Sequence, residues 1–256
     1  MHRFFVPKEQ ISNDQITITG SDVNHIKNVL RLKIGDKIEV FDSSQNTYQC
    51  EIKSFNRAVP AGRQEFILGS ILSMKKQDVE SNIKMTLAQC LAKGKKMDLI
   101  IKMATELGVN SIIPVISERS VPKIDEKEEK KIAHWQAIAK EASEQSGRTK
   151  IPRIENITSI SELNPKDYDL ALMPWEGEKI DSFKKALSKW NRDVQSQVPL
   201  PNNILIIVGP EGGFSHAEAE KAKEAGFKSV SLGKRILRCE TAAVSTLANI
   251  FYELEN

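Results

Sequence analysis

Two loops near the C-terminal end of the chain carry the residues best suited to hold a small ligand. An apolar run at 204–208 is typical of a buried parallel strand, and Gly209-Pro-Glu-Gly-Gly213 follows it directly. Glycine lets the backbone turn sharply and approach a ligand closely. A shorter strand at 229–232 and a loop at 233–238 repeat this arrangement. Because ligands of open α/β sheets bind outside the carboxyl ends of strands, both loops are predicted to border one pocket.

The kind of ligand is narrowed by what the first loop lacks. It has no Lys-Ser/Thr pair of a phosphate-binding P-loop, and its glycines do not follow the Gly-x-Gly-x-x-Gly spacing of a dinucleotide site. The carboxylate of Glu211 also argues against a polyphosphate. The alternative is that Gly212 and Gly213 form an ordinary tight turn. The capping box of Ser215 and Glu218, which predicts a helix directly after the loop, favours a pocket.

The elements that position these loops alternate between strands and helices. This alternation predicts an α/β fold with a parallel sheet and crossover helices. The expected strands are 83–91, 109–116, 151–157, 168–174, 204–208 and 229–232, and the expected helices are 96–107, 126–146, 181–190, 216–225 and 240–254. Trp135 falls on the apolar stripe of its helix, which favours a core position over base stacking.

The first part of the chain has a different pattern. Segments of period two at 15–19, 37–41, 48–52 and 65–68 predict a small sheet or barrel. A helix interrupts them, with Ser21 as its expected cap and an apolar face made of Val23, Ile26, Val29 and Leu30. The polar stretch 73–82 has no periodic pattern, so the boundary between two domains, 1–72 and 73–256, is expected there.

Composition places the chain among soluble globular proteins, with 40% hydrophobic and 28% charged residues in 256. The net charge of +3 does not by itself indicate a nucleic-acid binder. Cys50, Cys90 and Cys239 are spaced for neither a disulfide framework nor a zinc site, so no metal is expected. No apolar stretch is long enough for a membrane span and no leader is evident, which predicts a cytoplasmic protein.

Both loops together also carry a family resemblance. Gly209-Pro-Glu-Gly-Gly213 with Leu232-Gly-x-x-Ile-Leu-Arg-x-Glu-Thr241 closely resembles the RsmE family, the 16S ribosomal RNA (uracil-N3) methyltransferases of the SPOUT class. Further matches cover nearly the whole chain: Met1-His-Arg-Phe-Phe5, His25-Ile-x-x-Val-Leu-Arg31, Lys93-Gly-x-Lys-Met97, Glu106-Leu-Gly108, Ser117-Glu-Arg119 and Glu144-Gln-x-Gly-Arg148. The resemblance implies a PUA-like β-barrel at 1–72 that grips RNA. It also implies a SPOUT methyltransferase domain at 73–256, a trefoil-knotted parallel sheet with helices on both faces.

The resemblance further implies S-adenosyl-L-methionine as methyl donor, bound by three loops of the knot. The apolar side chains of these loops suit adenine, and their backbone groups suit its polar atoms. The residues expected to bind the cofactor are Leu172, Met173, Pro174, Val208, Gly209, Pro210, Glu211, Gly212, Gly213, Leu232, Gly233, Ile236, Leu237, Arg238 and Thr241.

The implied acceptor, N3 of uracil, must lose its proton at or before attack. The site should therefore offer a base or groups that stabilise the developing anion. Arg238 is expected to stabilise the uracil anion or its phosphate, and Glu240 to orient Arg238 or accept the proton. The alternative for Glu240 is that it merely begins the last helix, where acidic residues are favoured.

The RNA partner is expected to present an unpaired or flipped base and to be held largely through phosphates. The candidate phosphate ligands are Arg3, Arg31, Lys93, Arg119 and Arg148. The alternative is that these side chains form an ordinary solvated surface or, near 148, complete a helix dipole.

The implied partners are 16S ribosomal RNA, within the small ribosomal subunit, and a second copy of the chain in a homodimer. Two rival functions stay open at this stage. One is a knotted methyltransferase that acts on another RNA position, such as a transfer-RNA ribose. The other is a non-catalytic RNA-binding protein, which would not bind S-adenosylmethionine.

Overall fold

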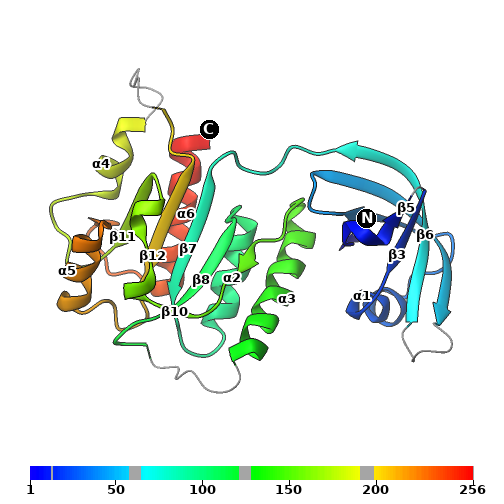
Figure 1. The fold of residues 1–256 in the computed structure, drawn as a ribbon, viewed down its shortest axis with the longest axis horizontal. Coiled ribbons are helices and arrows are strands. Elements are labelled where there is room, and N and C mark those ends of the chain that lie inside the picture. The colour runs from blue at the N-terminus through cyan, green and yellow to red at the C-terminus, as the bar shows by residue number, and fades with distance from the viewer. Residues whose placement is uncertain (13, 58–64, 121–127, 191–198, 256) are drawn as a thin grey trace. The chain divides into compact units, whose positions relative to one another are not determined.

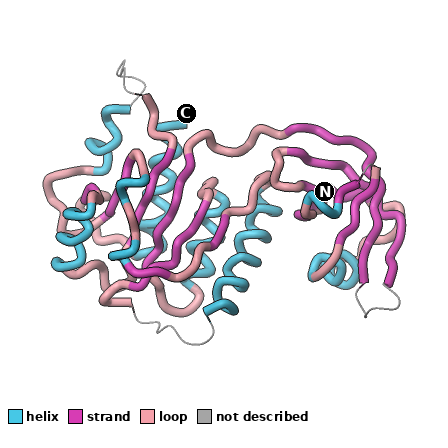
Figure 2. Tube along the Cα trace, viewed as in Figure 1, coloured by secondary structure: helices cyan, strands magenta, loops and turns pink. Residues whose placement is uncertain are grey.

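The chain folds into two units, which the computed structural model describes at residues 1–12, 14–57, 65–120, 128–190 and 199–255. The N-terminal unit comprises Met1–Glu80 and Ser143–Ile151, and the C-terminal unit comprises Ser81–Ala142 and Pro152–Asn256. Helix α3 (Glu128–Ser146) contributes residues to both. Figures 1 and 2 show the ribbon and the distribution of helices and strands along the chain.

The alternating segments of the N-terminal unit form a six-stranded sheet around one apolar core. The hydrogen-bonded order is β1-β4-β5-β6-β3-β2, and the β1–β4 pair is parallel whereas the other four pairs are antiparallel. The strands are β1 (Arg3–Phe5), β2 (Ile11–Ser12), β3 (Gln15–Ile18), β4 (Lys37–Phe41), β5 (Asn46–Arg57) and β6 (Glu65–Lys76). The predicted strand segments are confirmed, although β6 continues beyond residue 72, where the domain boundary was expected. That domain division stays a prediction.

The predicted helix of this unit forms with a different geometry. Gly20, with a φ of 72°, precedes helix α1 (Ser21–Asn24), and no side chain caps it, so the expected cap by Ser21 is wrong. The chain then widens into a π-helical segment, η2 (His25–Val29), in which the Leu30 amide donates to the His25 carbonyl over 2.9 Å. Val23 and Ile26 are buried, but the wider turn rotates Val29 off that face, and it is 63% exposed.

The C-terminal unit is built on a seven-stranded sheet whose described pairs are all parallel. Its order is β10-β8-β7-β12-β11-β13, with β9 also paired to β8. The strands are β7 (Lys84–Cys90), β8 (Ser111–Ile116), β9 (Arg153–Ile154), β10 (Thr158–Ser159), β11 (Leu170–Pro174), β12 (Asn203–Val208) and β13 (Lys228–Val230). The predicted α/β class is thus confirmed. The strand expected at 151–157 has only two residues, and the knot stays a prediction.

Helices α2 (Lys96–Glu106), α4 (Phe183–Leu187), α5 (His216–Ala225) and α6 (Cys239–Glu255) connect or follow these strands. Short 3-10 turns lie at η1 (Lys8–Gln10), η3 (Ile160–Glu162), η4 (Pro165–Asp167) and η5 (Ser188–Trp190). Ala219 and Ala222 of α5 pack on Leu205 and Ile207 of the sheet, while α2 and α6 lie behind it in Figure 1. Trp135 of α3 is buried, as its stripe predicts.

No helix among the described residues is both long and apolar enough to cross a lipid bilayer.

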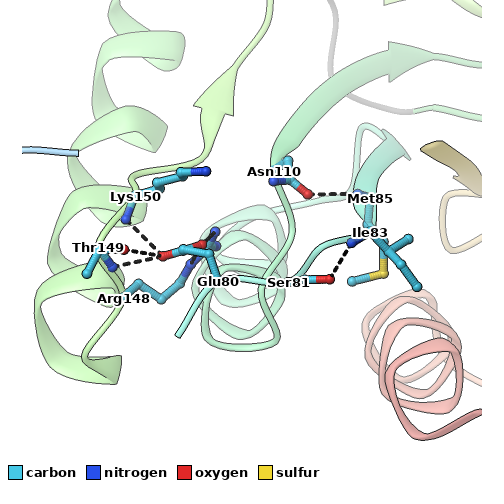
Figure 3. A network of polar contacts seen from close by, with 8 residues as sticks. All are labelled: Glu80, Ser81, Ile83, Met85, Asn110, Arg148, Thr149 and Lys150. Atoms are coloured by element: carbon cyan, nitrogen blue, oxygen red, sulfur yellow. Dashed lines mark hydrogen bonds and ion pairs between the residues drawn. The ribbon is translucent and has the colours of Figure 1, made fainter. Parts of the chain in front are cut away.

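A buried ion pair joins two distant segments of the N-terminal unit (Figure 3). The Arg148 Nη2 atom lies 2.7 Å from Glu80 Oε2, and the two side chains are 6% and 2% exposed. The other oxygen of Glu80 accepts hydrogen bonds from the amides of Thr149 and Lys150. Burial alone would raise the pKa of Glu80, but the hydrogen bond and positive charge of Arg148, together with the two amide hydrogen bonds, lower it below its usual value.

Candidate functional site

One pocket of the C-terminal unit lies where three neighbouring parallel strands end. β11 is paired on one side with β12 and on the other with β13, since Leu172 is in register with both Ile206 and Lys228. The segments that follow these three strands therefore meet at one edge of the sheet. They border a pocket with about 660 Å³ of empty space, a volume that includes the open mouth of the pocket.

Most of the predicted cofactor residues line this pocket. They are Pro174, Val208, Gly209, Pro210, Glu211, Gly213, Leu232, Gly233, Ile236 and Leu237. Leu172 and Met173 are instead fully buried within β11. Gly212, Arg238 and Thr241 lie beside lining residues in the chain but are not part of the lining. The two loops singled out in the sequence thus share one cavity, and their contact with the cofactor stays a prediction.

Sequence reasoning missed several residues that complete the lining. They are Trp175, Glu176, Phe214, Ser231, Arg235, Cys239 and Ala242. Ser231, Arg235 and Ala242 lie inside predicted segments, and the other four lie directly beside one. The available signal was position, because residues next to a strand end at the pocket also line it. Trp175 and Glu176 follow β11 in this way, and Trp175 is buried against His216, with ring centroids 5.1 Å apart.

The glycine loop, defined as Gly209–Gly213, strongly favours glycine at its last position. Gly213 has a φ of 65°, which side chains rarely adopt, and its amide donates to the Pro210 carbonyl over 3.0 Å. A Cβ atom at Gly213 would lie 2.8 Å from Oε1 of Glu176. The carboxylate of Glu176 therefore covers the α-carbon of Gly213 at the pocket wall.

Glu211 ties the glycine loop to the segment after β7. Its Oε1 atom accepts hydrogen bonds from the Lys93 amide and from Nζ of Lys96, both over 2.9 Å. Partial burial would raise the pKa of Glu211, but the hydrogen bonds from Lys96 and Lys93 lower it overall. Glu211 is therefore an ionised carboxylate at neutral pH, and it belongs to the pocket lining.

The two residues predicted to take part in catalysis lie at the start of α6. The Arg238 carbonyl accepts the amide of Ala242 over 2.8 Å, so Arg238 directly precedes the helix and its side chain is exposed. Glu240 is the second residue of α6, and its pKa is lowered chiefly by a hydrogen bond from its own backbone amide. The thiol of Cys239 donates to Glu240 over 3.2 Å, and burial raises the pKa of that thiol to about 12.

The five predicted RNA contacts differ in their surroundings. Arg31 and Lys93 are exposed, and Arg31 has an unusual φ of 55°. The Arg3 Nε atom forms an ion pair with Glu39 over 2.8 Å, and the arginine side chain is only 8% exposed. Arg148 is buried against Glu80, and Arg119 donates to the Gly212 carbonyl over 2.8 Å. Arg3, Arg119 and Arg148 thus each form a structural contact that the sequence did not predict. RNA binding by all five residues stays a prediction.

The described part of the chain contains no group of three or more His, Cys, Asp or Glu side chains that could hold a metal ion.

Family models match both units of the chain. A model described as an RNA methyltransferase domain matches residues 79–251, and one described as an RNA methyltransferase PUA domain matches residues 18–57. Together with the parallel sheet and its pocket, these matches define the class as RNA methyltransferases.

Relatives narrow this class to one family. "Ribosomal RNA small subunit methyltransferase E" of Bacillus subtilis (strain 168) is 34% identical over 100% of this chain and 98% of the relative. The protein of that name from Mesomycoplasma hyopneumoniae (strain 232) is also 34% identical, over 96% of this chain and 97% of its own. A crystal structure of the Neisseria gonorrhoeae protein bound to S-adenosyl methionine has a TM-score of 0.81 and 30% identity, and covers 99% and 98% of the two chains. The chain belongs to the ribosomal RNA small subunit methyltransferase E family.

Proposed function

We propose that this protein transfers the methyl group of S-adenosylmethionine to small-subunit ribosomal RNA, at N3 of one uracil. The observation that carries the proposal is the pocket at the ends of β11, β12 and β13, in a chain of this family. A relative with 30% identity over nearly the full length was crystallised with S-adenosyl methionine.

The residues of the pocket suit this cofactor. Leu232, Ile236 and Leu237 offer apolar surface for a purine ring, and the glycine loop offers backbone groups at close range. Glu176 and Glu211 add two carboxylates to the lining. Their negative charge is complementary to a ligand that carries both a sulfonium and an ammonium group.

S-adenosylmethionine supplies a methyl group on a positively charged sulfur, which a nitrogen nucleophile can attack in line. The chain must therefore hold the acceptor base against the pocket and stabilise the charge that appears when N3 loses its proton. We assign the second task to Arg238, because its guanidinium is exposed at the start of α6, directly after the lining residue Leu237.

Glu240 is assigned an electrostatic function in place of proton acceptance. Its lowered pKa makes it a weak base, whereas an efficient general base has a pKa near the working pH. A carboxylate in the first turn of α6 also interacts favourably with the helix dipole. The N3 proton would then leave to solvent while Arg238 stabilises the anion, and the sulfur keeps the electron pair of the broken carbon–sulfur bond.

RNA binding is assigned to exposed cations within each unit. Arg31 of the N-terminal unit and Lys93 of the C-terminal unit are free to approach phosphates. Arg31 adopts a left-handed backbone conformation that costs a non-glycine residue about 1 kcal/mol. Such strain is typical of residues kept for function. Arg3 and Arg148 would contribute to RNA binding only alongside their structural contacts, whereas the guanidinium of Arg119 is engaged with the Gly212 carbonyl.

The remaining assignments follow the family. We propose a trefoil-knotted sheet, an RNA-gripping N-terminal domain, a homodimer, and action in the cytoplasm on the small ribosomal subunit. Ile236 at the pocket and Tyr252 on α6 are 82% and 71% exposed, and both are apolar surfaces that a second copy could cover. Sedimentation at micromolar concentration distinguishes a dimer from a monomer.

Isothermal titration calorimetry tests the cofactor step. S-adenosylmethionine titrated into the full chain should bind at one site per chain without added metal. A Gly213→Ala variant should bind more weakly, because a Cβ atom at this position is strained and meets Glu176. Absence of any binding by the wild-type chain would favour the non-catalytic RNA-binding alternative and contradict the proposal.

A further inference from the structure

A tight turn after β8 lies against the glycine loop of the pocket. The turn comprises residues 117–120, and its first residue, Ser117, is buried. The Ser120 amide donates to the Ser117 carbonyl over 3.0 Å, and the two hydroxyls are 2.8 Å apart. The turn is therefore held in shape by its own hydrogen bonds, directly at the end of a sheet strand.

Arg119 extends from this turn to the glycine loop. Its Nη1 atom donates a hydrogen bond to the Gly212 carbonyl over 2.8 Å. The side-chain stem also packs on the glycine, because a Cβ atom built on Gly212 would lie 3.3 Å from Cβ and 3.4 Å from Cδ of Arg119. The arginine thus contacts Gly212 both through its charged end and through its aliphatic carbons.

Glu118, the residue before Arg119 in the turn, forms hydrogen bonds to the start of α5. Its amide donates to Oε1 of Glu218 over 2.6 Å, and its carboxylate accepts the hydroxyl proton of Ser215 over 2.6 Å. Ser215 and Glu218 form the capping box of α5. Glu118 and Arg119 of the turn are therefore hydrogen-bonded to both ends of the segment 212–218, at Gly212 and at Glu218.

We propose that Arg119 is a positioning residue for the cofactor pocket, which acts through the Gly212 carbonyl. Glycine loses more conformational freedom on ordering than any other residue, so a loop with three glycines among five residues needs external contacts to keep one shape. Arg119 supplies such a contact on one flank, and Lys96 supplies another through Glu211. The inference rests on the proposed function, because it concerns the same pocket.

This function differs from the phosphate contact that the sequence suggested for Arg119. A phosphate contact depends on positive charge and changes the salt dependence of RNA binding. A hydrogen bond to a carbonyl depends on a donor at the right distance, and a neutral amide can supply one. Arg119→Ala removes both charge and donor, whereas Arg119→Gln removes the charge and keeps a donor. Lys102→Gln, at an exposed lysine of α2, is the matched control for loss of one positive charge.

Calorimetry with S-adenosylmethionine and RNA-binding titrations at several salt concentrations separate the two functions. Arg119→Ala should weaken cofactor binding by roughly 10-fold, the loss expected for one hydrogen bond to a charged group. Arg119→Gln should recover most of that loss, and Lys102→Gln should bind the cofactor as the wild type does. The salt dependence of RNA binding should be the same in Arg119→Gln and the wild type. Thermal unfolding checks that Arg119→Gln is folded. The comparison of Arg119→Gln with the wild type is then valid even if Arg119→Ala does not fold.

Two results would overturn the inference. One is wild-type cofactor affinity in Arg119→Ala. The other is a reduced salt dependence of RNA binding in Arg119→Gln with unchanged cofactor affinity, which would assign Arg119 to a phosphate. Either result leaves cofactor binding by the wild-type chain intact, so the proposed function would stand. Failure of the wild type to bind S-adenosylmethionine would instead contradict both.

Discussion

Lys96 and Glu211 lie 115 residues apart in the chain, yet Nζ of Lys96 donates a hydrogen bond to Oε1 of Glu211 over 2.9 Å. Lys96 is the first residue of α2, where a lysine opposes the helix dipole and so has no local benefit. Its contact with the glycine loop explains its presence. The pair also keeps an ionised carboxylate at the pocket wall.

We predict that Lys96→Ala weakens S-adenosylmethionine binding by roughly two- to five-fold, as expected for a partly exposed ion pair. The pKa of Glu211 should rise when its ammonium partner is removed, because that partner lowers it. As the pH is lowered, the variant should therefore lose cofactor binding at a higher pH than the wild type does. Calorimetry between pH 4 and 7 measures this shift, with Lys96→Arg as control. Identical pH dependence in Lys96→Ala and the wild type would show that the pair does not act on the pocket.

Gly213→Ala should weaken cofactor binding more than it destabilises the fold. The left-handed backbone costs a residue with a Cβ atom about 1–2 kcal/mol, and the added carbon would also meet Glu176. Gly94→Ala is the matched control, because its φ is 59° and no atom lies within 4 Å of the added carbon. Calorimetry and thermal unfolding on both variants separate strain from steric conflict. Equal cofactor affinities in the two variants would contradict the close packing at Gly213.

Arg238 and Glu240 should differ sharply in their effect on methyl transfer. Arg238→Met should reduce the single-turnover rate by about 10²-fold, the loss typical of one group that stabilises a developing anion. Glu240→Gln should reduce it by less than about 10-fold, because its electrostatic interaction at a helix start is weak.

The pH profile of Glu240→Gln gives the second part of this test. A carboxylate with a lowered pKa is already ionised above pH 6, so its removal should leave the shape of the profile unchanged between about pH 6 and 9. If the methylation rate rises with pH in that range for the wild type but not for Glu240→Gln, Glu240 is the proton acceptor.

The buried pair of Glu80 and Arg148 should contribute strongly to the stability of the N-terminal unit. Arg148→Met leaves a buried carboxylate without its partner and should cost about 3–5 kcal/mol of unfolding free energy. The double variant Glu80→Met/Arg148→Met should recover much of that loss. Urea unfolding followed by circular dichroism at pH 7 measures both. A single variant as stable as the wild type would contradict the importance of the pair.

The pair of Glu80 and Arg148 should also make the stability of the protein decrease at acidic pH. The pKa of Glu80 is lower in the folded than in the unfolded state, so the stabilisation is complete above the unfolded value of about 4.3 and is lost as pH falls through the folded value. Wild-type stability should therefore decline below about pH 4.5 more steeply than that of the double variant.

Local sequence patterns predicted the elements well because their causes are local. The helix His216–Ala225 begins with the predicted capping box and has the predicted bounds, and Gly226 follows it with a φ of 120°. The glycine loop and the loop 233–238 were also correctly placed after strands. The exposure of Val29 was not predictable, since a one-residue widening of a helical turn has no distinctive pattern of apolar residues.

Contacts between distant segments could not be predicted from spacing. Arg119 and Arg148 were selected as RNA contacts because cations near strand and helix ends suit phosphates, yet their partners Gly212 and Glu80 lie 93 and 68 residues away in the chain. Trp175 and Glu176 directly follow the predicted strand 168–174, and nothing in their spacing marks them as pocket residues. Their place in the pocket follows from the order β12-β11-β13, which no local pattern specifies.

Methylation of purified small ribosomal subunits is the most direct measurement. The subunits should come from cells that lack this protein, with S-adenosylmethionine labelled in its methyl group, and the product should be digested to nucleosides. We predict one methyl group per subunit, recovered as N3-methyluridine and strongly reduced with Arg238→Met. A label found on ribose, on another base or on no nucleoside at all would contradict the assigned reaction.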